Sequence, residues 1–159
     1  MSRLLFALAL TSLLLASSAA VTVDNRSTPA TPGGAAQSFY AFHMSHDVGF
    51  SKEGVAQREP WLSPDLVSLC RKYLARPSSP DEVPPIDGDP FTDSQESPTS
   101  YKVGKVRLTG GTASVEISFS GPAANKGSVH LVLLQTKGAW LIDDVRYVSG
   151  PSFRRLLAQ

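Results

Sequence analysis

The spacing of hydrophobic and polar residues changes its period near residue 100. Before that point, apolar side chains recur at helical intervals in two segments, and after it they alternate with polar residues as in half-buried β-strands. Residues 76–100 join the two parts and show no regular period, but they are rich in proline and acidic side chains. This order predicts helices, then a long loop, then a sheet.

Two helices are predicted in the first part. One runs from Ala36 to about His46, where aromatic and aliphatic residues crowd one stripe. The other follows Ser63, a good N-cap residue, and has Pro64 at the first helical position, where the missing N–H of proline costs nothing. Pro77 is expected to end this second helix.

Four strands and a short terminal helix after Ser152 are predicted in the second part. The strands span residues 101–108, 113–119, 129–135 and 139–148. Gly104 is a candidate bulge in the first strand, and Gly110-Gly111 forms a tight turn after it. We therefore expect an α+β fold, with the N-terminal helices packed on a curved antiparallel sheet of about four strands.

The first 20 residues have the pattern of a bacterial signal peptide. Arg3 precedes a short apolar segment at 4–16, and small residues follow up to Ala20. Cleavage near Ala20 predicts a periplasmic or secreted protein with no membrane attachment afterwards. Residues 21–35 are expected to be a flexible leader, because they hold almost no large apolar side chain. The single domain then covers residues 36–159.

Composition excludes several classes of function. The 159 residues carry 15 basic and 14 acidic side chains, and loss of Arg3 with the signal peptide leaves 14 of each. A chain without basic excess is not expected to bind nucleic acid. The lone Cys70 excludes an internal disulfide and a thiolate metal cluster within one chain. No phosphate-binding loop or dinucleotide fingerprint is present, so no cofactor is predicted.

Five short motifs resemble exported bacterial proteins of the DUF3828 family. They are Phe39-Tyr40, the run 61–66 (WLSPDL), Asp89-Pro90-Phe91 with Asp93-Ser94-Gln95, the run 101–104 (YKVG), and the run 140–147 (WLIDDVRY). The last run is the most specific, and the resemblance extends from about Ala36 to Leu157. It implies an NTF2-like, cystatin-like α+β fold of uncharacterised function. In that fold group, a cavity between sheet and helices serves as an enzyme or ligand site, or the domain is a dimer scaffold.

Asp143 and Asp144 are candidate acid or base groups on the last strand. Consecutive strand residues point to opposite faces, so we expect at most one of them to enter a cavity. Burial near Tyr101 or Tyr40 would raise its pKa and suit it to general base catalysis. The favoured alternative is a structural brace, with one aspartate paired to Arg146 or to the loop at 93–95.

Two groups of residues carry side chains that can bind metal ions, but the sequence predicts a metal site at neither. Asp87, Asp89 and Asp93 carry hard oxygen ligands, but their spacing does not fit a calcium loop and Pro90 interrupts them. His43 and His46 lie three residues apart on the first predicted helix, but no third ligand accompanies them in the sequence.

The sequence favours an exported, non-catalytic binding or interaction module over an enzyme. Its ligand or protein partner is expected in the cavity or on the sheet face, which also offers a homodimer interface. The residues expected to line or brace this site are Tyr40, Asp93, Gln95, Tyr101, Trp140, Asp143 and Arg146. Two alternatives stay open: a small isomerase-type or hydrolase-type enzyme that uses a buried aspartate with a tyrosine, and an inhibitor or immunity protein.

Overall fold

The computed structural model describes residues 29–46, 48–77, 84–121 and 127–159. The expected signal peptide and most of the expected leader lie outside these ranges. The described helices are α1 (Pro32–His43), α2 (Lys52–Arg58), α3 (Pro64–Leu74) and α4 (Phe153–Leu157), with a 3-10 turn η1 (Glu59–Trp61) before α3. None of them is long and apolar enough to cross a membrane.

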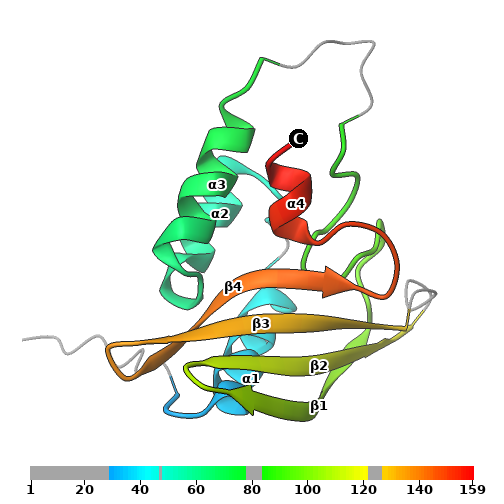
Figure 1. Cartoon of the computed structure of the whole chain (residues 1–159). Coiled ribbons are helices and arrows are strands. Elements are labelled where there is room, and N and C mark those ends of the chain that lie inside the picture. Colours follow the sequence, from blue (N-terminus) through cyan, green and yellow to red (C-terminus); the bar gives the residue numbers. More distant parts are fainter. Residues whose placement is uncertain (1–28, 47, 78–83, 122–126) are drawn as a thin grey trace, which may run out of the picture.

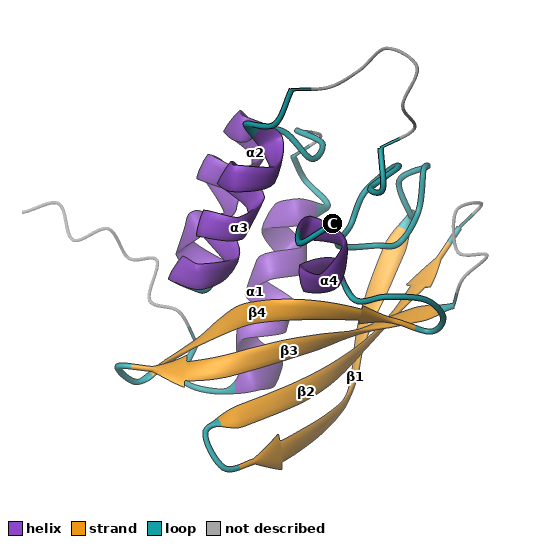
Figure 2. Cartoon of the chain, turned by 45° about the horizontal axis from the view of Figure 1, so that its top comes forward, coloured by secondary structure: helices purple, strands orange, loops and turns teal. Residues whose placement is uncertain are grey.

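The four strands form one antiparallel meander, which confirms the α+β prediction. They are β1 (Ser100–Thr109), β2 (Thr112–Ser120), β3 (Ser128–Thr136) and β4 (Ala139–Tyr147), and they lie in the order β1-β2-β3-β4. Helix α1 packs across the sheet, while α3 and α4 pack against β4 and against each other (Figure 1). The opposite face of the sheet carries no helix from the described part of the chain (Figure 2).

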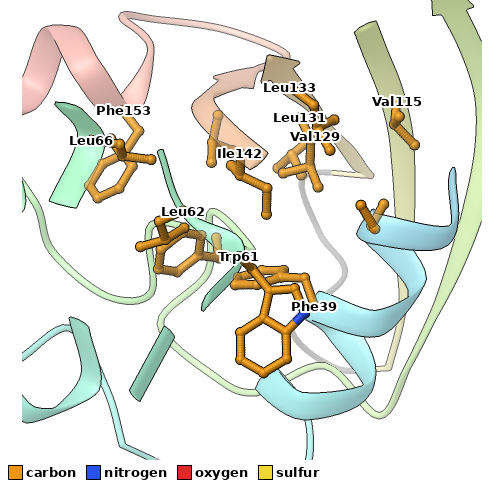
Figure 3. Close-up of a cluster of buried hydrophobic side chains, with 14 of the residues drawn as sticks. Phe39, Trp61, Leu62, Leu66, Val115, Val129, Leu131, Leu133, Ile142 and Phe153 are labelled. Carbon is orange, nitrogen blue, oxygen red and sulfur yellow. The ribbon is translucent and has the colours of Figure 1, made fainter. Parts of the chain in front are cut away.

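Side chains from the helices and the sheet fill the space where a cavity was expected. Phe39 and Tyr40 of α1 are fully buried there, and alternate residues of β2 and β3 face them. Leu62, Leu66 and Phe153 close the other end of the core (Figure 3). Burying a large aliphatic or aromatic side chain contributes about 1.5–3 kcal/mol. This packed interior holds the helices on one face of the sheet.

Helix α1 begins at Pro32, four residues before the predicted start of the domain. Thr31 caps it by accepting a hydrogen bond of 3.2 Å from the backbone N–H of Gly34, and Pro32 occupies the first helical turn. These are the capping signals that mark α3, where Ser63 and Pro64 stand in the same places. Residues 32–35 therefore belong to the helix, and the prediction of a leader that reaches residue 35 was wrong for them.

Helix α2 was not predicted. Ser51 caps it by accepting a hydrogen bond of 3.0 Å from the backbone N–H of Gly54. The helix is only seven residues long and has Gly54 as its third residue, so it gives little periodic signal. It matters for the candidate site because it delivers the buried side chain of Arg58.

Two strands contain bulges. The predicted bulge at Gly104 is confirmed, since the β1–β2 register shifts between Val103 and Val106. A second shift lies between β3 and β4, where Val132 pairs with Asp144 but the next residue pairs with Ile142. Asp143 is the additional residue at this bulge.

Candidate functional site

The two candidate aspartates lie at the bulge of β4, and both contact Arg154 of α4. Asp143 accepts hydrogen bonds from the Arg154 guanidinium at 2.5 Å and from the Ser63 hydroxyl at 2.6 Å. Asp144 accepts one from the backbone N–H of Arg154 at 2.9 Å. The prediction that the pair serves opposite faces was wrong, because the bulge breaks the alternation. The cation that pairs with Asp143 is Arg154 and not the predicted Arg146.

This contact is a structural brace. The Ser63 hydroxyl that donates to Asp143 also accepts the backbone N–H of Leu66 at 3.0 Å, which caps α3. The backbone N–H of Ser63 donates to the carbonyl of Ile142 at 2.8 Å. Asp143 therefore connects β4 to the start of α3 and to α4, and its carboxylate is not available as a general base.

Asp143→Ala is expected to lower the free energy of unfolding by about 2 kcal/mol, because two donors lose a charged acceptor in a half-buried place. Urea denaturation followed by tryptophan fluorescence measures the change. Asp65→Ala, which removes an exposed carboxylate from α3, is the matched control and should cost clearly less. Equal losses in the two variants would contradict the brace.

The other expected site residues do not form one site. Tyr40 and Trp140 belong to the hydrophobic core. The Tyr40 hydroxyl donates to the carbonyl of Phe91 at 2.6 Å, and burial raises the pKa of Tyr40 well above its usual value. The ring of Tyr101 lies 5.3 Å from that of Tyr40, so these two meet, and the Tyr101 hydroxyl accepts a hydrogen bond from the Gln37 amide at 2.7 Å.

The remaining three lie elsewhere. Asp93 occupies a turn of the loop before β1 with φ +54°. Gln95, two residues later, donates its side-chain amide to Asp87 at 2.6 Å. Arg146 is exposed on β4, in register with His130 of β3. The predicted set is thus divided among the core, the loop, the brace and the sheet.

A network of polar side chains, not foreseen as a unit, lies between α1, α2 and the loop. Asp89 accepts hydrogen bonds from His43 Nε2 at 2.7 Å, from the Thr92 hydroxyl at 2.8 Å and from the backbone N–H of Phe91 at 3.0 Å. Arg58 Nε donates to His43 Nδ1 at 3.0 Å. The side chains of His43 and Arg58 are buried, and that of Asp89 is 28% exposed.

The geometry fixes the protonation of this network. Arginine stays protonated, so His43 Nδ1 accepts from Arg58 and the ring proton lies on Nε2, facing Asp89. Both ring nitrogens are occupied, and the ring stacks on Phe39 with centroids 5.3 Å apart. His43 therefore has no free nitrogen with which to accept a substrate proton. The network joins α1 and α2 to the loop.

The pKa of Asp89 reflects these contacts. Burial favours the neutral acid, but hydrogen bonds from His43, Phe91 and Thr92 outweigh it and hold the pKa of the carboxyl below its ordinary value. Burial also lowers the pKa of Arg58, against the attraction of Asp89. Asp89 is therefore a carboxylate near neutral pH, facing the cation of Arg58 across the imidazole ring.

Because the pKa of Asp89 is lowered in the folded protein, the free energy of unfolding depends on pH in the acidic range. The contribution of Asp89 is complete above its unfolded-state pKa, near 3.9, and is lost as the pH falls through the lower folded-state pKa. We expect the free energy of unfolding to fall more steeply below about pH 4 in the wild type than in Asp89→Asn. Urea denaturation at pH 7 and at several acidic pH values measures both slopes. Parallel slopes would show that Asp89 is not held in its charged form.

The surface of the described residues includes a small pocket and an open groove. A pocket beside the network is lined by His43, Met44, His46, Gly49, Arg58, Asp89, Ser97 and Pro98 and has a volume of about 80 Å³. Ligand pockets usually hold roughly 300–1,000 Å³. A wider, open groove of about 460 Å³ lies between η1, α3 and β4. The first is too small for an organic ligand of ordinary size.

Metal binding and thiol chemistry gain no support from the described residues. They contain no group of three or more histidine, cysteine or acidic side chains that could hold a metal ion. The ring of His46 instead stacks on Phe42 at 4.1 Å. Cys70 is fully buried, and burial raises its thiol pKa to about 12, so the nucleophilic thiolate is suppressed.

Comparisons with known proteins identify a fold but no family. No family model and no curated protein matches the sequence, so the resemblance to the DUF3828 family stays a prediction. Two solved structures match, both of the type VI effector–immunity complex Tae3–Tai3 from Ralstonia pickettii, in native and selenomethionine forms. The native form has a TM-score of 0.59 and 22% identity over 77% of this chain and 99% of the other. The selenomethionine form gives 0.56 and 22% over 76% and 99%. The chain therefore shares its α+β fold with a chain of that complex.

Proposed function

We propose that this chain is a non-catalytic protein-binding module of the inhibitor or immunity kind. The packed interior carries the proposal. Where a ligand cavity was expected, the side chains of α1 and the strands fill the space, and Tyr40 and Trp140 are part of that core. Recognition then falls to the outer surface. A protein partner can use a broad surface, whereas a small ligand needs a concave pocket that encloses most of it. The groove of about 460 Å³ between η1, α3 and β4 has the volume for such a ligand, but it is open to solvent.

The polar residues support a binding role over catalysis. The carboxylate of Asp143 is engaged by Ser63 and Arg154. Asp89 and His43 satisfy each other within the network at α1 and α2. General acid–base catalysis needs a group that reaches the substrate and can exchange a proton with it. These side chains are instead used to hold the helices and the loop together.

The structural comparisons support a protein partner. The chain shares its fold, over almost the whole length of the matched chain, with a protein crystallised in an effector–immunity complex. At 22% identity, the shared fold supports a protein partner in general, and no residue of this chain takes its role from the matched chain. The proposal includes export, because residues 1–20 have the pattern of a signal peptide. A partner would then be met in the periplasm or outside the cell. It also includes an NTF2-like domain of the DUF3828 type, which rests on the sequence motifs.

The test is purification of the tagged full chain, expressed with its own N-terminus in its host bacterium, from the periplasmic and secreted fractions. We expect one protein to co-purify, to form a stoichiometric complex with this chain when both are pure, and to lose activity in that complex. Native mass spectrometry of the same preparation tests for the opposite outcome, in which the chain carries a small molecule and no protein. A small molecule retained without any protein partner would overturn the proposal.

A further inference from the structure

We propose that the free edge of β1 is the docking site and that it takes an extended, acidic segment of the partner protein. This inference rests on the proposed function, because it assumes a protein partner. β1 pairs with β2 alone in the described part of the chain and is the outermost strand of the sheet (Figure 1). Edge strands bind extended peptides through main-chain hydrogen bonds, with side-chain contacts adding selectivity.

Exposed apolar side chains lie along this edge. Every residue from Gly104 to Thr109 is exposed, and Val106 and Leu108 are 42% and 62% exposed. Their partners on β2 are Val115 and Ala113, which face the core, so Val106 and Leu108 lie on the helix side of the sheet. Val106 lies beside the start of α1, where its Cγ2 would be 3.5 Å from a Cβ placed on Gly33, and the more exposed Leu108 extends the apolar surface farther along the strand. A strand added to β1 would find apolar contacts on that side.

The charge of the same strand selects the partner. β1 carries Lys102, Lys105 and Arg107 and no acidic residue, and among the described residues none of the three forms an ion pair. The nearby acid is Glu116 of β2, whose carboxylate would lie 3.4 Å from a Cβ placed on Gly104. Opposite charges on neighbouring strands stabilise pairing and like charges oppose it. Acidic side chains on an added strand would therefore complement β1.

The basic edge stands out against a chain whose formal net charge is only +1. Residues 101–159 contain eight basic and three acidic side chains, and two of the three acids, Asp143 and Asp144, are engaged by Arg154. Pairing of β1 with a second copy would bring cations together, which protects against self-association. Nucleic acid is less favoured, since the edge offers three cations and apolar side chains rather than a groove of basic residues. An acidic protein strand satisfies both the backbone and the charges.

The first experiment uses a capped peptide of about ten residues with alternating glutamate and valine, and a matched peptide with lysine in place of glutamate. Amide hydrogen exchange of the full chain is followed by NMR. We expect the glutamate peptide to slow exchange on β1, from residue 100 to 109, and to bind about tenfold more tightly than the lysine peptide. Equal binding of the two peptides, or protection of the β1 edge in the protein alone, would overturn the inference.

A charge-reversed variant makes the test specific to the edge. Lys105→Glu/Arg107→Glu is expected to reverse the preference between the peptides. Lys52→Glu is the matched control, because it changes an exposed lysine at the start of α2, where an acidic residue is favourable. Unchanged preference in the double variant, concentration-dependent dimers of the wild type, or equally effective competition by duplex DNA would each count against the inference.

The two proposals fail separately. If a protein partner is found and the double variant binds it with unchanged affinity, the edge is the wrong surface and the proposed function stands. If no protein partner exists, the proposed function fails, and the peptide measurements still show whether the edge selects acidic strands.

Discussion

Asp89→Ala is expected to lower the free energy of unfolding by about 3 kcal/mol, the lower end of the range for breaking a buried charged pair. Three donors lose their acceptor at once: the ring of His43, the hydroxyl of Thr92 and the backbone N–H of Phe91. Arg58, of which 2% is exposed, then keeps a buried positive charge without its counter-charge. The loss falls at the lower end because water reaches part of Asp89, whose side chain is 28% exposed.

Urea denaturation at pH 7, followed by circular dichroism, measures this loss. Asp87→Ala is the matched control, because Asp87 lies two residues earlier in the same loop but is exposed and contacts only the side chain of Gln95 among the hydrogen bonds of the described residues. The urea midpoint of Asp87→Ala should equal that of the wild type. If Asp89→Ala and Asp87→Ala lose the same stability, Asp89 is a surface residue of the loop and the network does not hold the helices.

Local signals in the sequence were sufficient to predict the elements whose boundaries depend on neighbouring residues. Ser63 and Pro64 mark the start of α3, and the structure confirms both the cap and the helix. Alternation from Ala113 to Phe119 predicted β2, whose buried residues are the apolar ones. These features depend on neighbours within a few residues, so their physical cause is visible in the sequence itself.

Contacts between distant residues could not be predicted in the same way. His43 and Asp89 are 46 residues apart in the sequence, and only the tertiary fold brings α1 and the loop together. Asp143 was expected to follow simple alternation, but the bulge depends on how β4 pairs with β3. Arg58 was missed because a charged residue in a short helix with Gly54 carries no periodic signal of burial. One local signal pointed to part of the network. Asp89 precedes Pro90 and has Thr92 three residues later, which is a pattern that favours a turn stabilised by the Asp89 side chain.

The aromatic side chain of the same loop should be as important as the carboxylate. Phe91 is 1% exposed, and its ring centroid lies 5.0 Å from that of Phe39 and 5.5 Å from that of Phe153. The guanidinium of Arg58 lies over the ring at 5.6 Å. Phe91 thus joins the loop to α1, α2 and α4 at one point.

Phe91→Ala is expected to cost about 3–5 kcal/mol, since it removes a fully buried ring and leaves a cavity that the rigid neighbours cannot close. Val148→Ala, at a position that is 67% exposed, is the control and should leave the urea midpoint unchanged. The variant also tests how the network and the core depend on each other. Because the Phe91 ring under Arg58 and the carboxylate of Asp89 anchor the same loop, each substitution loosens the segment that the other depends on, so Phe91→Ala and Asp89→Ala combined should cost less than the sum of the two. Full additivity would show that the loop is anchored at two independent places.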